Sequence, residues 1–116
     1  MIEPVSGLPE GVSGLRAIGT IVERDVTEAV ASAVDVTQIS KDRGLVVFAG
    51  PDFDGYLAEL VRGLAKEAAV APFARYALVV KDDELDEVRQ YGCFGADNLR
   101  VFGERARQSA IEWAAG

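Results

Sequence analysis

Residues 44–57 constrain the fold more than any other part of the sequence. They open with an apolar run at 45–49, whose β-branched and aromatic residues are typical of a strand buried on both faces. Gly50 and Pro51 end that strand, and a strongly helical pattern follows two acidic residues. Strand, acidic turn and helix make half of a βαβ unit. Ligands of open α/β sheets bind beside such turns, at the carboxyl ends of the strands.

We therefore place the candidate partner- or ligand-binding site at this turn. Its residues are Asp52, Phe53, Asp54, Gly55 and Tyr56.

The rest of the chain alternates between strand and helix patterns. Residues 2–5 and 12–20 are separated by a short Gly- and Pro-containing segment, which predicts an antiparallel hairpin. Pro4 lacks an N–H for a ladder, so the first strand should lie at a sheet edge. Helical patterns begin at Val22 and recur at about 54–70, 81–91 and 104–115, while short apolar runs at 76–80 and 98–102 predict two more strands. Residues 35–43 carry no clean period and are expected to fray into a loop.

The element order is therefore β-β-α-β-α-β-α-β-α. It predicts an α/β fold with a mixed, mostly parallel five-stranded sheet, an N-terminal hairpin and about four helices. At 116 residues, the chain is long enough for one domain, 1–116, with a core that needs no metal or disulfide.

Individual positions carry packing predictions. Val22, Val26, Val30 and Val34 recur every four residues, so we expect them on the inner face of the first helix. Gly63 interrupts the second helix at a cost of roughly 1 kcal/mol against alanine, which suggests close approach to another element.

Further along the chain, each unusual side chain has a structural interpretation. Asp82, Asp83 and Glu84 are expected to start the third helix, where acids complement the dipole. Arg105 and Arg107 are interpreted as solvated, and Cys93 as an inert core residue. The predicted inner face of the terminal helix is Ala106, Ala110, Trp113 and Ala114. The aromatic residues expected in the core are Tyr76, Phe102 and Trp113.

Composition narrows the function. Nineteen acidic against twelve basic residues give a net charge of -7, which disfavours binding to nucleic acid or an anionic bilayer. The absence of histidine removes Ser-His-Asp and Cys-His nucleophiles and imidazole-bound zinc. No apolar run is long enough to span a membrane, no signal peptide is recognisable, and one cysteine suits a reducing compartment. We expect a cytoplasmic protein without a cofactor.

Several short motifs carry a family resemblance. They are residues 1–3 (Met-Ile-Glu), 8–12 (Leu-Pro-Glu-Gly-Val), 50–55 (Gly-Pro-Asp-Phe-Asp-Gly), 91–92 (Tyr-Gly), 99–102 (Leu-Arg-Val-Phe), and a terminal helix with Ala110 and Trp113. Together with the element order they resemble the STAS superfamily, named for sulfate transporters and bacterial anti-sigma factor antagonists. Within it, the chain is similar to the small stand-alone SpoIIAA-like bacterial family. The resemblance implies regulation by protein contact, or binding of non-polar ligands or membrane surfaces, and no enzymatic activity.

The acidic turn departs from the phosphorylated members of that superfamily. Those members carry Asp-Ser-Ser-Gly, and the second serine accepts phosphate, whereas Asp54 stands at the corresponding position here. Asp54 has a fixed charge and no hydroxyl, so a kinase-operated switch is not expected at this turn.

Structural alternatives remain open for the same residues. Asp54 is a good N-cap for the second helix, which is compatible with a partner contact. Phe53 is either folded onto that helix as a staple residue or exposed as an apolar contact.

The turn also resembles the first motif of haloacid-dehalogenase-type phosphatases. There the first Asp is the nucleophile and the second a general acid near magnesium, and residues 81–83 (Lys-Asp-Asp) could mimic further catalytic groups. Three features oppose this interpretation. Gly50 and Pro51 separate the strand from the acids, Tyr56 replaces an expected threonine, and the chain is short.

Three hypotheses follow. The first is a non-enzymatic binding module, a monomer or weak homodimer, that contacts a partner through residues 52–56 and the exposed side of the second helix. The second is a carrier or sensor, free or membrane-associated, that holds a small non-polar ligand between helices and sheet and opens at the first helix. The third and most remote is a magnesium-dependent phosphatase.

Overall fold

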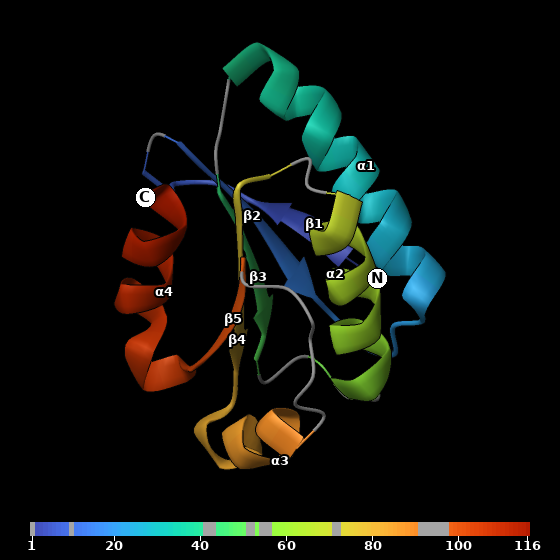
Figure 1. The fold of residues 1–116 in the computed structure, drawn as a ribbon, viewed down its shortest axis with the longest axis vertical. Coiled ribbons are helices and arrows are strands. Elements are labelled where there is room, and N and C mark those ends of the chain that lie inside the picture. The colour runs from blue at the N-terminus through green and yellow to red at the C-terminus, as the bar shows by residue number, and fades with distance from the viewer. Residues whose placement is uncertain are drawn as a thin grey trace.

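One sheet of five strands runs through the middle of the molecule, with helices on both sides (Figure 1). The computed structural model describes residues 2–9, 11–40, 44–50, 53, 57–70, 73–90 and 98–116. The strands are β1 (Ile2–Val5), β2 (Val12–Ala17), β3 (Gly44–Ala49), β4 (Arg75–Val80) and β5 (Leu99–Gly103). They lie side by side in the order in which they occur in the chain. The β1–β2 pair is antiparallel and the other pairs are parallel, which confirms the predicted α/β fold with a mixed, mostly parallel sheet.

The sheet follows the sequence patterns closely. All six residues of β3 are buried, as expected for the central strand. The strand β1, which carries Pro4, lies at an edge, so the missing N–H costs no ladder bond inside the sheet. The strand β2 ends at Ala17 and not at residue 20, because Gly19 adopts a φ of 67° that leaves the extended conformation.

In the described part of the chain, four helices and two short 3₁₀ turns connect and flank the strands. They are α1 (Glu23–Ser40), α2 (Leu57–Val70), η1 (Asp82–Glu84), α3 (Leu85–Gln90), η2 (Glu104–Ala106) and α4 (Arg107–Ala115). Asp82, Asp83 and Glu84 do begin the third helical segment, as predicted. The expected loop over 35–43 is wrong up to Ser40, since α1 continues to that residue. No glycine or proline interrupts residues 23–40, so nothing in the backbone forces an earlier end.

The first turn of α1 corrects a second expectation. Val22 is 49% exposed and does not face the core. It immediately precedes the helix, and its backbone N–H donates a hydrogen bond to the Asp25 carboxylate (3.1 Å), the reciprocal half of a capping box. Val26 and Val30 are buried as predicted, whereas the side chain of Val34 lies outside the described part of the structure.

The helices α1 and α2 cover one face of the sheet, and α4 covers the other (Figure 1). The larger apolar cluster lies under α1 and α2 and includes Leu60 and Leu64. Gly63 brings the two helices together. A Cβ at this position would lie 2.9 Å from the Cβ of Val26, which confirms the predicted close approach.

Tyr76 illustrates how completely the residues of that cluster are buried. Its side chain is 1% exposed, its hydroxyl accepts a bond from the Phe73 N–H (3.2 Å) and donates one to the Glu67 carbonyl (3.4 Å). Burial raises the pKa of Tyr76 to about 12, and the negative charge of Glu67 adds to the effect, against the Phe73 N–H. The tyrosine is therefore core, as expected.

The smaller cluster lies between the sheet and α4. Ala110 and Ala114 are buried there as predicted, and Ile111 joins them although the sequence pattern did not include it. The sheet and the helix meet closely at Gly44. A Cβ on that residue would lie 2.0 Å from the Ala114 carbonyl oxygen, so only glycine fits.

Candidate functional site

The structure describes one of the five predicted site residues. Asp52, Asp54, Gly55 and Tyr56 lie outside the described residues, as does Cys93. Phe53 is 6% exposed and belongs to the cluster under α1 and α2. Its backbone N–H donates to the Gly50 carbonyl (3.0 Å). Of the two alternatives for Phe53, packing into the interior is therefore the one that the structure supports, and its ring is not an exposed contact.

The surface next to this turn is set by one row of side chains across the sheet. Strand register aligns Glu3, Arg16, Phe48, Val79 and Phe102 on five neighbouring strands. Residues in register point to the same face of a sheet, here the face that α4 packs on. From the β1 edge, the row therefore presents an acid, a base, an aromatic ring, an aliphatic group and a second aromatic ring.

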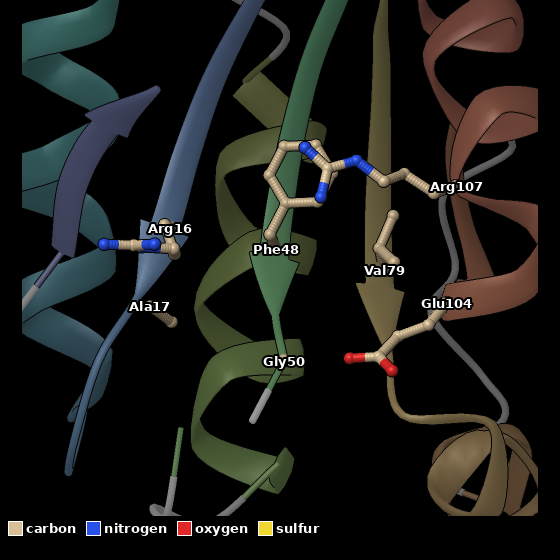
Figure 2. Close-up of a pocket in the computed structure, with 7 residues that line it drawn as sticks. All are labelled: Arg16, Ala17, Phe48, Gly50, Val79, Glu104 and Arg107. Atoms are coloured by element: carbon tan, nitrogen blue, oxygen red, sulfur yellow. The ribbon is translucent and has the colours of Figure 1, made fainter. Parts of the chain in front are cut away.

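The helix α4 covers only part of this row. It packs mainly on β4 and β3 and much less on β2. Arg107 lies over the Phe48 ring, with its guanidinium carbon 4.4 Å from the ring centroid. Arg107 is the first residue of α4, and Figure 2 shows it reaching from there across Phe48. Phe48 is 7% exposed and belongs to the buried cluster under α4, so its ring is covered by Arg107 together with the other residues of that cluster.

A groove of about 340 Å³ opens at this place, at the carboxyl ends of β2 and β3. We call it the Phe48 groove. Its lining residues are Arg16, Ala17, Phe48, Gly50, Val79, Glu104 and Arg107 (Figure 2). A second hollow of about 290 Å³ shares Arg16, Phe48 and Arg107 and extends along β1 past Pro4 and Ser6. The two form one trough across the open part of the sheet.

The charged side chains that line the groove differ in whether they are ion-paired. Arg16 forms an ion pair with Glu3 on the neighbouring strand. The Glu104 carboxylate lies beside Gly50, where a Cβ would meet its Oε1 at 3.0 Å. Within the described part of the chain, neither the Arg107 guanidinium nor the Glu104 carboxylate has an ion-pair or hydrogen-bond partner.

Glu104 and Arg107 are held in place by the turn that carries them. Asp82 on η1 accepts a hydrogen bond from the Arg105 backbone N–H (3.3 Å) and pairs with the Arg105 Nε (3.5 Å). A Cβ on Gly103 would lie 2.2 Å from the Asp82 Oδ1, so glycine is required for this approach. The pair fixes η2, and with it the start of α4, against the end of the sheet.

Trp113 anchors the other end of α4. Its carbonyl accepts a hydrogen bond from Arg75 (2.7 Å), and the guanidinium groups of Arg75 and Arg100 each lie 5.4 Å from its ring centroid. Phe102 packs on the same ring with the centroids 6.0 Å apart. Both aromatic residues are partly buried and act in packing, close to their predicted role.

Sequence reasoning missed this groove. Arg107 is exposed, as expected, and it also lies over the Phe48 ring. The expectation for Arg105 is also incomplete, since this residue is 92% exposed yet tied to Asp82. The sequence marks this groove only weakly. Phe48 is the only aromatic residue of its strand, and a strand pattern does not show which side chain will lie over it.

The residues of the phosphatase alternative are partly visible. Lys81 pairs with Glu84 (3.4 Å), and Asp82 pairs with Arg105, so both have structural partners. Among the described residues, no three acidic or cysteine side chains group as metal ligands do. The motif residues Asp52 and Asp54 lie outside that part of the chain.

A third hollow, of about 460 Å³, lies at the hairpin. Its walls come from β1, β2, the segment between them and two residues of α1, and most of the side chains are apolar. The lining residues are Ile2, Pro4, Val5, Ser6, Gly7, Leu8, Val12, Ser13, Gly14, Leu15, Ala29 and Ser32. We call it the hairpin hollow.

Comparison with protein-family models, with curated proteins and with solved structures gives no match for this chain. Within the described ranges, no helix has both the length and the apolar character that crossing a bilayer requires.

Proposed function

We propose that this protein is a non-enzymatic, cytoplasmic binding module of STAS-like type. It recognises a protein partner through the Phe48 groove at the carboxyl ends of β2 and β3 and through the site predicted at residues 52–56. The element order and the mixed sheet support the STAS-like part of the proposal.

One observation carries the proposal. The Phe48 ring lines a groove at the carboxyl edge of the sheet, and an arginine side chain lies over it. Surfaces that bind partners combine such an aromatic or aliphatic centre with a charged rim, and arginine and aromatic residues are enriched among those that contribute most of the binding energy. Moving Arg107 aside presents Phe48 to a partner without disturbing the backbone.

Affinity capture from cells that produce the protein tests this function. Tagged wild type is compared with Arg107→Glu, which reverses the charge over Phe48, and with Arg24→Glu as a control. Arg24 is 84% exposed on α1, on the opposite side of the sheet, and pairs only loosely with Glu28 (3.9 Å). We expect a protein that copurifies with wild type and with the control and is lost with Arg107→Glu. An identical set of proteins for all three chains would refute the proposal.

The hairpin hollow favours a second candidate, a carrier of a small non-polar ligand. Its volume falls within the range of small-molecule sites, and its wall includes α1, the helix expected to open. Native mass spectrometry of protein purified without detergent tests this candidate. A non-covalent mass excess that Ala29→Trp removes supports the carrier, whereas a bare mass with lipid or fatty acid added in excess contradicts it.

A further inference from the structure

Among the described residues, the Phe48 groove presents a cation without an ion-pair partner above an apolar floor. The guanidinium carbon of Arg107 lies 4.4 Å from the Phe48 ring centroid, and its N–H donors have no acceptor in that part of the chain. A guanidinium can bind two oxygens in one plane, as a carboxylate offers. Contact with the ring also restricts the arginine side chain, which lowers the conformational entropy that it loses on binding.

The second cation of the trough lies on the same side of the sheet. Arg16 is the register partner of Phe48, so the two arginines flank the same ring, one from β2 and one from α4. Arg16 is half exposed and is paired with Glu3 through one of its terminal nitrogens. Its remaining N–H donors add positive potential to the trough, but Arg16 does not present a second pair of uncommitted, parallel N–H donors.

Glu104 limits the charge of the group that can bind. Its carboxylate stands at the Gly50 end of the groove without a cationic partner in the described structure. Glu104 repels any anion and weakens the attraction of the two arginines, so a dianion such as phosphate, which loses far more hydration than a single negative charge does, gains less on binding. The floor of Phe48 and Val79 in turn requires an apolar body next to the anionic group.

From this arrangement we infer that the Phe48 groove binds a carboxylate attached to an apolar group, with Arg107 holding the carboxylate and Phe48 contacting the apolar group. The inference rests on the proposed function, because it names the chemistry that the same groove accepts. Two sources supply this chemistry, a free apolar carboxylic acid and the C-terminal carboxylate of a polypeptide that ends in an apolar residue.

Titration of ¹⁵N-labelled protein, followed by amide and arginine Nε–H NMR signals, tests the inference with defined probes. The free acid is 3-phenylpropionate, and its control is 3-phenylpropionamide. The peptide is acetyl-Ala-Ala-Leu-Phe with a free C-terminus, and its control is the same peptide with a C-terminal amide. We expect saturable shifts at Phe48, Gly50 and the Arg107 Nε–H with at least one carboxylate, and weaker binding of the matching amide. Which carboxylate binds more tightly identifies the source.

Arg107→Met provides the matched variant. Methionine keeps an unbranched apolar chain over Phe48 but removes the charge and the donors, and a dispersed spectrum verifies that the variant is folded. We expect an affinity loss of about tenfold or more, because a charge-assisted pair is lost. Arg24→Met, on the opposite face, should bind as wild type does.

Three results would overturn the inference: no saturable shift at the groove with either carboxylate, equal affinity for acid and amide, or unchanged affinity in Arg107→Met. These outcomes are separable from a failure of the proposed function. If Arg107→Glu still loses its partner while no carboxylate binds, only the ligand chemistry is wrong. If Arg107→Glu captures the same proteins as wild type, the protein-contact function itself fails.

Discussion

Gly63→Ala measures how tightly α1 and α2 are packed. Alanine in the middle of a helix stabilises it by roughly 1 kcal/mol relative to glycine. The new methyl group, however, would lie 2.9 Å from the Val26 Cβ and 3.1 Å from both of its Cγ atoms. A β-branched side chain in a helix has essentially one rotamer, so Val26 cannot turn away and the helices must separate. Overpacking of this kind costs about 1–3 kcal/mol, so we expect a net loss of about 1 kcal/mol.

Urea denaturation followed by circular dichroism measures the loss, and a double-mutant cycle assigns it. Val26→Ala removes both Cγ atoms, so Gly63→Ala should be close to neutral in that background, with a coupling of about 1 kcal/mol. Comparison of Arg62→Ala with Arg62→Gly, at a neighbouring position whose side chain is 60% exposed, calibrates the helix propensity alone. A stabilising Gly63→Ala, or additive effects in the cycle, would refute the packing argument.

Three further perturbations follow from the structure. Because the pKa of Tyr76 is raised from 10.0 to about 12, the neutral phenol stabilises the fold below pH 10 and this contribution is lost as the pH rises toward 12. The free energy of unfolding, measured by denaturation at two alkaline pH values, should fall by roughly 2 kcal/mol more for wild type than for Tyr76→Phe. Equal decreases for the two proteins would contradict the burial argument. Gly44→Ala should cost about 2–3 kcal/mol in the same assay, since α4 must move away from the Ala114 carbonyl, and an unchanged midpoint would contradict that contact. Asp25→Ala removes the hydrogen bond to the Val22 N–H and should cost about 1 kcal/mol, measured by thermal unfolding; a change within error would show that the bond contributes nothing.

The fold was predictable because its signals are local. Strand β3 and helix α2 are each recognisable from their own apolar pattern, and Gly63 was correctly singled out as a point of close approach. The errors lie at element ends. Val22 fits the period of α1 but precedes its first turn, so it is exposed, and α1 extends to Ser40 although its last residues show little periodicity.

The groove could not be predicted in the same way. It depends on register, which places Arg16 beside Phe48, and on the packing of α4, which places Arg107 over the Phe48 ring. Both are features of the tertiary structure, and the spacing of residues along the chain reveals neither of them. The predicted site and the groove share one edge of the sheet, because Gly50 ends β3 and also lines the groove.

The consecutive strand order has a consequence for the growing chain. As the polypeptide leaves the ribosome, each strand finds the neighbour that it will pair with already made, so the sheet can lengthen one strand at a time. The face under α4 is different. Among the described helices α4 alone packs there, and it is synthesised after every strand. Val46, Phe48 and Val79 therefore stay uncovered until that last helix emerges, and a nascent chain halted at Gly103 should bind a hydrophobic dye or a chaperone that the finished protein does not.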